Sequence, residues 1–95
     1  MNKTLSLMGL ARKAGKLGIG HDVVFAAVRN GTAKAVILTS DASPRHAREL
    51  EAAGFSGRVI VTDADMDEVG RALGKRSCIF SVDDSGFAKA IEKTV

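Results

Sequence analysis

Apolar and polar positions along the chain follow a helical repeat in some segments and form short continuous apolar runs in others. Residues 3–14 carry apolar side chains at helical spacing, and Gly15 after them is expected to end a helix as a left-handed cap. Residues 16–20 are expected to form a loop or a very short strand. A second helix is predicted over residues 21–30, with Gly31 ending it. The side chains expected to face inward from this helix are Val24, Ala27 and Val28.

Three apolar runs rich in β-branched residues are predicted to be strands that helices cover on both faces. They are residues 35–38, 59–61 and 78–82. The last run contains Cys78, the one cysteine of the chain, which is expected to be a buried and inert thiol.

Helix-start signals follow each of these runs. Ser43 is predicted to cap a third helix with Pro44 at its first position, and this helix runs to Gly54. Asp65 and Glu68 form the capping-box pattern of a fourth helix, which Gly74 ends. Asp83 and Asp84 are expected to cap a final helix. The apolar side chains assigned to that final helix are Phe87, Ala88, Ile91 and Val95.

This alternation predicts an α/β fold, a central sheet with helices on both faces. Residues 1–95 are expected to form one domain, because two parts of this chain would be too small to hold separate cores. No stretch approaches the roughly 20 apolar residues that cross a bilayer, and no signal peptide is recognisable. We therefore expect a cytoplasmic protein without a membrane partner, and a monomer.

Charge is distributed unevenly along the sequence. Residues 1–48 carry eight Lys and Arg against two Asp, a net charge of +6, whereas residues 49–95 carry six basic and nine acidic side chains, a net charge of −3. Such a division is typical of a protein with one face for a polyanion.

Motifs for catalysis, cofactors and metals do not form. Gly9 to Lys16 lacks the spacing of a P-loop, and the acidic residues from Asp63 onward lack the Gly and Glu of a calcium loop. His21 and His46 have no ligand-spaced partner in the sequence, so no metal site is predicted, and His46 is expected to be partly exposed in the third helix. We predict no cofactor and no enzymatic activity.

Three loops are expected at one edge of the sheet: Gly18–Asp22, Thr39–Arg45 and Gly74–Ser77. They offer flexible glycine backbone, a helix N-terminus that can hold phosphate, and basic side chains. The chain has no Trp or Tyr, which argues against a platform that stacks single-stranded bases. Ordinary solvated loops remain an alternative at this point.

Four segments in order are similar to the L-seven-Ae ribosomal protein family, and within it to the small bacterial YlxQ-type members. They are Leu7–Lys16, Ala33–Ser43, Val69–Lys75 and Val82–Ile91. The resemblance implies a three-layer α/β/α sandwich with a mixed four-stranded sheet. It also implies ribosome- or translation-associated binding of kink-turn RNA, which is a bent internal loop with tandem sheared G·A pairs, or of ribosomal RNA.

The family reads those G·A pairs with a Gly-x-Asn-Glu-x-x-Lys motif at the start of the second helix. Its glycine corresponds to Gly20 in this chain. Its Asn, Glu and Lys positions are occupied by Asp22, Val23 and Ala26. Asp22 has no amide donor, Val23 cannot form a side-chain hydrogen bond, and Ala26 is too short to reach a phosphate or a base. We therefore expect structured-RNA binding with altered selectivity.

In this hypothesis glycine opens a positively charged loop edge to RNA backbone, and basic side chains neutralise phosphates. The residues expected to bind RNA are Lys16, Gly20, His21, Asp22, Val23, Ser40, Asp41, Lys75, Arg76 and Ser77. Ribosomal proteins are further expected partners. The alternative is a protein-interaction module of the same fold with weakened RNA specificity, which an exposed Phe25 or Val23 would favour.

Overall fold

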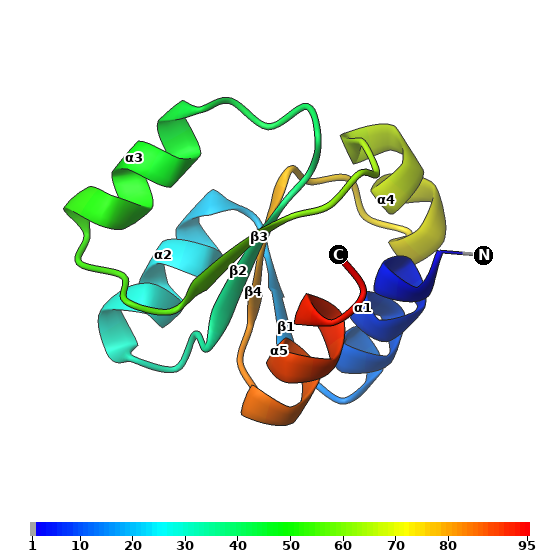
Figure 1. Cartoon of the computed structure of the whole chain (residues 1–95), viewed down its shortest axis with the longest axis horizontal. Helices are drawn as coiled ribbons and strands as arrows, with labels where there is room; N and C mark the ends of the chain where they lie inside the picture. Colours follow the sequence, from blue (N-terminus) through cyan, green and yellow to red (C-terminus); the bar gives the residue numbers. More distant parts are fainter. Residues whose placement is uncertain (1) are drawn as a thin grey trace.

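The computed structural model describes residues 2–95, in which five helices cover the two faces of a four-stranded sheet (Figure 1). The strands are β1 (Leu17–Ile19), β2 (Ala35–Leu38), β3 (Arg58–Val61) and β4 (Ile79–Val82). The helices are α1 (Lys3–Lys13), α2 (His21–Asn30), α3 (Arg45–Ala52), α4 (Met66–Leu73) and α5 (Ser85–Glu92). The strands lie in the order β1-β4-β2-β3, with β4 antiparallel to both neighbours and β2 parallel to β3. The expected α/β/α sandwich with a mixed sheet is confirmed.

The two faces of the sheet each carry a hydrophobic core. Helices α2 and α3 lie on one face, and α1, α4 and α5 lie on the other (Figure 1). The central strands β2 and β4 are buried along their whole length, so they contribute side chains to both cores. Val36, Leu38 and Ile79 pack toward α2 and α3. Ile37, Phe80 and Val82 pack toward the other three helices.

Most helix ends follow the signals in the sequence. Helix α2 has the predicted bounds and ends at Gly31, which is in the left-handed conformation. Asp65 and Glu68 form both hydrogen bonds of a capping box at the start of α4. Asp84 accepts a hydrogen bond from the N–H of Phe87 at the start of α5. These ends are fixed locally, since each depends on groups within four residues of one another.

The prediction that β3 is covered on both faces is wrong. Ile60 is 3% exposed, but Val59 and Val61 are 38% and 59% exposed. Strand β3 lies at the edge of the sheet, and both valines lie on the α2 and α3 face beside their partners in β2. The two helices of that face do not cover the edge strand.

Three local predictions also need correction. Helix α3 begins at Arg45, one residue later than expected, and Ser43 Oγ accepts a hydrogen bond from the Arg45 N–H. Helix α5 ends at Glu92, which leaves Val95 beyond it and 61% exposed. Cys78 precedes β4 and is only half-buried.

His46 was expected to be partly exposed and is instead buried, at 8% exposure.

Within residues 2–95, no helix combines the length and the apolarity that crossing a bilayer requires.

Candidate nucleic-acid interface

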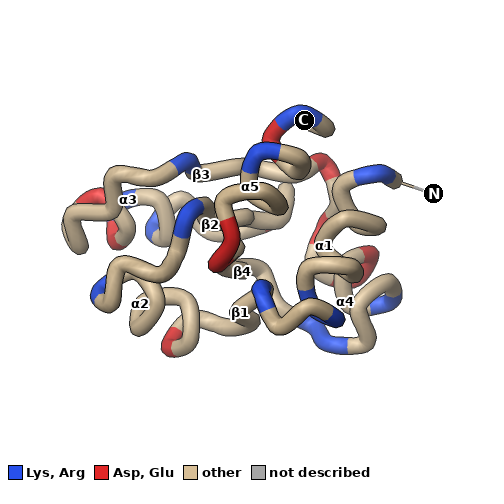
Figure 2. The backbone as a smooth tube through the Cα atoms, turned by 90° about the horizontal axis from the view of Figure 1, so that it is seen from below, with Lys and Arg blue, Asp and Glu red and all other residues tan. Residues whose placement is uncertain are grey.

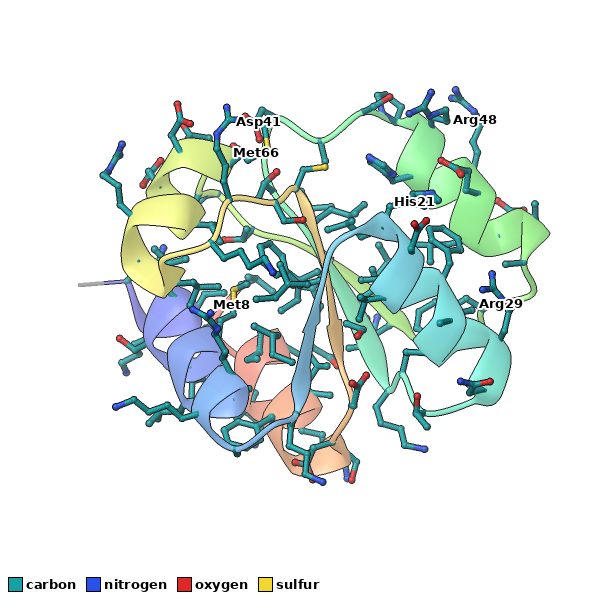
Figure 3. All side chains as sticks on the ribbon, turned by 180° about the vertical axis from the view of Figure 1, so that it is seen from behind. Met8, His21, Arg29, Asp41, Arg48 and Met66 are labelled. Atoms are coloured by element: carbon teal, nitrogen blue, oxygen red, sulfur yellow. The ribbon has the colours of Figure 1, made fainter. Side chains whose placement is uncertain are left out.

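Four connecting segments meet at one end of the sheet. Strands β1, β2 and β3 run in the same direction and β4 runs against them, so the segments after the first three strands and before β4 share one end. We call this end the loop edge; it consists of residues 39–44 and 74–78, together with residues 20–23 and 62–67, which include the first residues of α2 and α4. His21 and Asp41 mark it at the top of Figure 3. The three loop regions expected to lie together therefore do so.

Backbone hydrogen bonds hold the segments of the loop edge to one another. The N–H of Gly20 donates to the carbonyl of Ile79 at 3.2 Å, and the N–H of Thr39 donates to the carbonyl of Cys78 at 3.1 Å. The N–H of Ser40 donates to the carbonyl of Ala64 at 2.9 Å. These bonds fix the positions of the four segments relative to one another.

The junction between β1 and α2 depends on a glycine. Gly20 has φ 103° and ψ 157°, a combination that residues with a Cβ rarely adopt. No side chain from residues 2–95 caps the N-terminus of α2, so the N–H groups of its first turn stay available to a ligand. A Cβ on Gly20 would meet nothing within 4 Å, which means that the surface is open at this point. Such a helix terminus is suited to phosphate.

The first turn of α2 carries two polar side chains and one apolar side chain outward. His21 and Asp22 are exposed, and Val23 is 53% exposed. Phe25 is 7% exposed and lies under His21, with 4.5 Å between the two ring centroids. A hydrogen bond from His21 Nε2 to Glu49 at 3.1 Å raises the pKa of the imidazole and lowers the pKa of the Glu49 carboxyl.

Asp41 connects two segments of the loop edge. One of its carboxylate oxygens accepts hydrogen bonds from Thr39 Oγ1 at 2.7 Å and from the N–H of Met66 at 3.1 Å. The first of these bonds is the main cause that lowers the pKa of Asp41. Asp41 therefore shapes the loop edge, while its neighbour Ser40 is exposed on it.

The segment before β4 carries the predicted basic pair. Arg76 Nε donates to Asp67 at 2.8 Å, and this hydrogen bond raises the pKa of the guanidinium. Lys75 is exposed and forms no ion pair with any residue from 2 to 95. Ser77 Oγ donates to the carbonyl of Ile79 at 3.0 Å, so this hydroxyl is used within the segment. Of the basic pair Lys75 and Arg76, Lys75 is therefore the one whose charge is more available to bind a phosphate.

Lys16 lies away from the other predicted residues. It precedes β1, and its carbonyl accepts a hydrogen bond at 2.8 Å from the N–H of Asp83, which follows β4. Gly20 follows β1 at the other end of the sheet, about 13 Å away at the usual rise of a strand. The structure therefore does not bring Lys16 to the loop edge.

Basic residues from α1 lie near α4, and the sequence prediction did not include them. The guanidinium of Arg12 donates to the carbonyl of Leu73 at the end of α4. Figure 2 shows Lys and Arg segments gathered around α1 and α4. We call Arg12, Lys13, Arg71, Lys75 and Arg76 the basic group. Its signal in the sequence is the Arg12-Lys13 pair in the last turn of α1.

The loop edge was expected to be positively charged, and it carries charges of both signs instead. Asp41 and Asp67 lie there, and Asp22 is fully exposed at 105%. Asp41 and Asp67 already have hydrogen-bond donors within the protein. The basic group lies at the side of α1 and α4, and its members Lys75 and Arg76 belong to the loop edge.

Comparison with known proteins gives the family. The sequence profile of the ribosomal protein L7Ae/L30e/S12e/Gadd45 family matches residues 2–92. The chain belongs to this family. RNA-binding protein YlxQ of Enterococcus faecium is 31% identical over 94 residues, which are 98% of this chain and 91% of that protein. RNA-binding protein YlxQ of Bacillus subtilis is 36% identical over 87 residues, which are 90% of this chain and 87% of that protein.

A solved structure supports the same relationship. A protein of unknown function from Bacillus halodurans is 34% identical, with a TM-score of 0.87 over 99% of this chain and 97% of that one. The family resemblance inferred from four sequence segments is therefore confirmed. The family and these two relatives are named for ribosomes and RNA binding and not for a reaction, in agreement with the prediction of a non-enzymatic protein.

Proposed function

We propose that this chain binds structured RNA, kink-turn-like or ribosomal, through the loop edge and the adjacent basic group. The observation that carries the proposal is the junction at Gly20. There the helix N-terminus has no side-chain cap, and the glycine has no Cβ that would hinder the approach of RNA backbone. Membership of the L7Ae/L30e/S12e/Gadd45 family and the names of the YlxQ relatives support it. The protein would act in the cytoplasm, in association with ribosomes or translation.

The residues of the loop edge have separate roles in this proposal. The N–H groups of residues 21–23 would meet phosphate or base edges, and Gly20 would let RNA backbone approach. His21, Asp22, Val23 and Ser40 would line the contact from the protein side. Asp41 and Ser77 would hold the segments in shape, because their side chains are engaged within the protein.

A titration with two RNAs tests the proposal. A kink-turn RNA and a copy with its G·A pairs replaced are titrated at two salt concentrations. We expect tighter binding of the intact kink-turn at both. Equal, weak and strongly salt-dependent binding would leave only general charge attraction, and no binding at low salt would contradict RNA recognition.

A variant that restores the family's motif sharpens this test. The substitutions Asp22→Asn, Val23→Glu and Ala26→Lys provide the amide, the carboxylate and the amine that the motif uses. If each base contact contributes about 1–3 kcal/mol, affinity for the intact kink-turn should rise at least tenfold, and affinity for the replaced copy should rise much less. An equal rise for both RNAs would show that the added groups make no specific contact.

One observation favours the alternative, a protein-interaction module. Val23 is 53% exposed at the reading position, where an apolar side chain suits a protein partner. Phe25 is buried and gives no such support. A ribosomal protein or translation factor that binds the wild-type chain and not a Val23→Glu variant would support this alternative.

A further inference from the structure

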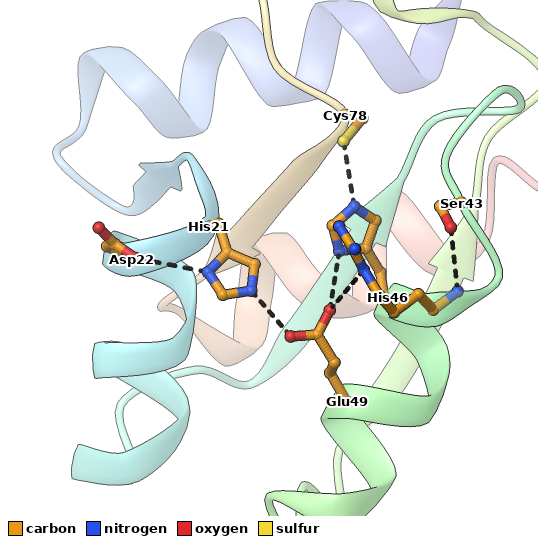
Figure 4. Close-up of polar contacts among 7 residues, drawn as sticks. His21, Asp22, Ser43, His46, Glu49 and Cys78 are labelled. Atoms are coloured by element: carbon orange, nitrogen blue, oxygen red, sulfur yellow. Dashed lines mark hydrogen bonds and ion pairs between the residues drawn. The ribbon is translucent and has the colours of Figure 1, made fainter.

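Two histidines and a glutamate that are far apart in the sequence converge beside the loop edge. His21 lies in the first turn of α2, and His46 and Glu49 lie one helical turn apart on α3. One ligand atom from each of the three residues lies within 4.8 Å of the others. Figure 4 shows the Glu49 carboxylate pointing between the two imidazoles. The sequence did not predict this cluster, because His21 and His46 lack the spacing of metal ligands and only the tertiary fold brings α2 and α3 together.

The second nitrogen of each imidazole already has a neighbour. His21 Nδ1 lies 3.4 Å from Asp22 Oδ1, and His46 Nε2 lies 3.5 Å from Cys78 Sγ. His21 Nε2 donates to Glu49 while the imidazole is protonated. Once that proton is lost and a hydrogen stays on each outer nitrogen, His21 Nε2 and His46 Nδ1 both direct lone pairs toward Glu49. Metal-binding histidines are oriented in the same way, by a hydrogen bond from the nitrogen that does not touch the metal.

Two of the atoms that face one another, one on His46 and one on Glu49, form no hydrogen bond with residues 2–95. His46 is buried, since only 8% of its surface is exposed, and its Nδ1 has no hydrogen-bond partner among residues 2–95. The same is true of Glu49 Oε1, which lies 3.7 Å from that nitrogen. This separation exceeds a hydrogen bond. Two ligand atoms on one tetrahedral zinc ion lie about 3.3 Å apart, so a small movement would bring both into contact with such an ion.

We propose that His21 Nε2, His46 Nδ1 and a carboxylate oxygen of Glu49 bind one divalent transition-metal ion, with Zn²⁺ as the best match. Two imidazoles and a carboxylate are ligands that Zn²⁺ accepts, and three protein ligands leave a fourth position for water. The side chains of His21 and Glu49 are 46% and 35% exposed, so an ion can enter from solvent. The bound ion would join α2 to α3 next to the start of α2.

One cation competes for the same carboxylate. Arg45 Nε lies 3.4 Å from Glu49 Oε1, and its side chain is 69% exposed. An exposed ion pair of this kind is weak, and the arginine side chain can turn toward solvent. Removing Arg45 should therefore maintain or increase metal affinity, whereas removing a ligand should decrease it.

Calorimetric titration of the untagged chain with ZnCl₂, and optical titration with Co²⁺, test this site without RNA. We expect one ion per chain and the visible absorption of four-coordinate Co²⁺. Glu49→Gln and His46→Asn should each weaken Zn²⁺ binding at least 100-fold, since losing an outer partner alone weakens it about 10–100-fold. Glu51→Gln makes the same chemical change on α3, two residues away and on another face, and should leave affinity unchanged.

Circular dichroism of each variant without metal controls for folding. His21→Gln removes a ligand whose side chain is exposed, and Arg45→Gln removes the competing cation. The absence of stoichiometric binding by the wild-type chain would overturn the proposal. Binding that survives His21→Gln and Glu49→Gln unchanged would do the same. Neither result would bear on RNA binding, which is measured in the presence of a chelator.

Discussion

At the scale of single residues, Gly20 is the position where backbone conformation most directly serves the loop edge. Its φ of 103° with ψ of 157° lies in a region that is almost exclusive to glycine. At the other end of the same helix Gly31 has φ 75° and ψ 12°, the milder left-handed conformation. The two glycines differ in strain although neither Cβ would meet an atom within 4 Å.

Replacing each of these glycines with alanine should therefore have different effects. We expect Gly20→Ala to lower the free energy of unfolding by about 2–3 kcal/mol and Gly31→Ala by about 1 kcal/mol. Urea denaturation measures both. An equal loss in the two variants would show that the backbone at residue 20 relaxes without penalty.

His21 should make stability depend on pH. The hydrogen bond to Glu49 raises its pKa above 6.5, so the protonated imidazole stabilises the folded state fully below pH 6.5. This contribution is lost as the pH rises through the raised pKa. The groups that face the imidazole are Glu49, Asp22 and His46.

The free energy of unfolding, measured with a chelator present, should thus decline as the pH rises above 6.5 and through the raised pKa of His21, and His21→Gln should reduce this decline. An unchanged slope in the variant would assign the decline to other groups. The Glu49 carboxyl has its pKa lowered below 4.5, so its contribution should instead be lost on acidification.

At the scale of elements, capping side chains fix where helices start. Asp65 accepts a hydrogen bond from the N–H of Glu68 at 2.8 Å and completes the capping box of α4. Asp65→Ala should lower the free energy of unfolding by about 1 kcal/mol, whereas Asp65→Asn should have little effect because asparagine caps equally well. Thermal or urea denaturation of the two variants checks this. Similar losses in both would point to the negative charge of Asp65 and not to the cap.

Strand β3 shows how position in a sheet overrides sequence pattern. Its three apolar residues 59–61 looked like a fully buried strand, yet only Ile60 is buried. Val61→Thr should change the free energy of unfolding by less than about 0.5 kcal/mol, as surface substitutions do. Ile60→Thr buries a hydroxyl in place of a packed side chain and should lower it by at least about 2 kcal/mol. Comparable losses would show that the edge strand is covered in solution.

At the scale of the whole molecule, strand direction decides which side chains meet. It gathers four connecting segments at one end of the sheet and leaves Lys34, which precedes β2, at the opposite end. It also brings Arg12 of α1 against the end of α4, next to the segment that carries Lys75.

Neutralising Lys75 should therefore weaken RNA binding, and neutralising Lys34 should not. With Lys75→Gln we expect the slope of log affinity against log salt to fall by about 0.7–0.9, and with Lys34→Gln we expect no change. Both lysines are exposed, so the two variants differ only in location. If log affinity had the same slope against log salt in both variants, Lys75 would not contact the RNA.

The sequence by itself determined the order and type of the elements, most of their ends and the family. These features depend on periodicity, glycine caps such as Gly31 and capping side chains such as Asp65, all of which act within a few residues. It also placed the loops Gly18–Asp22 and Thr39–Arg45 at one edge, because both follow strands that run in the same direction. The loop Gly74–Ser77 joins them because β4 runs antiparallel to its neighbours.

The tertiary structure alone decided which strand lies at the edge, that Lys16 is separated from Gly20, and that Arg12 approaches α4. It likewise decided that His21 meets His46 and Glu49. These are contacts between residues distant in the chain, and their distances depend on how helices pack on the sheet. No local pattern of side chains encodes that packing, since it is set by the summed burial of two hydrophobic cores.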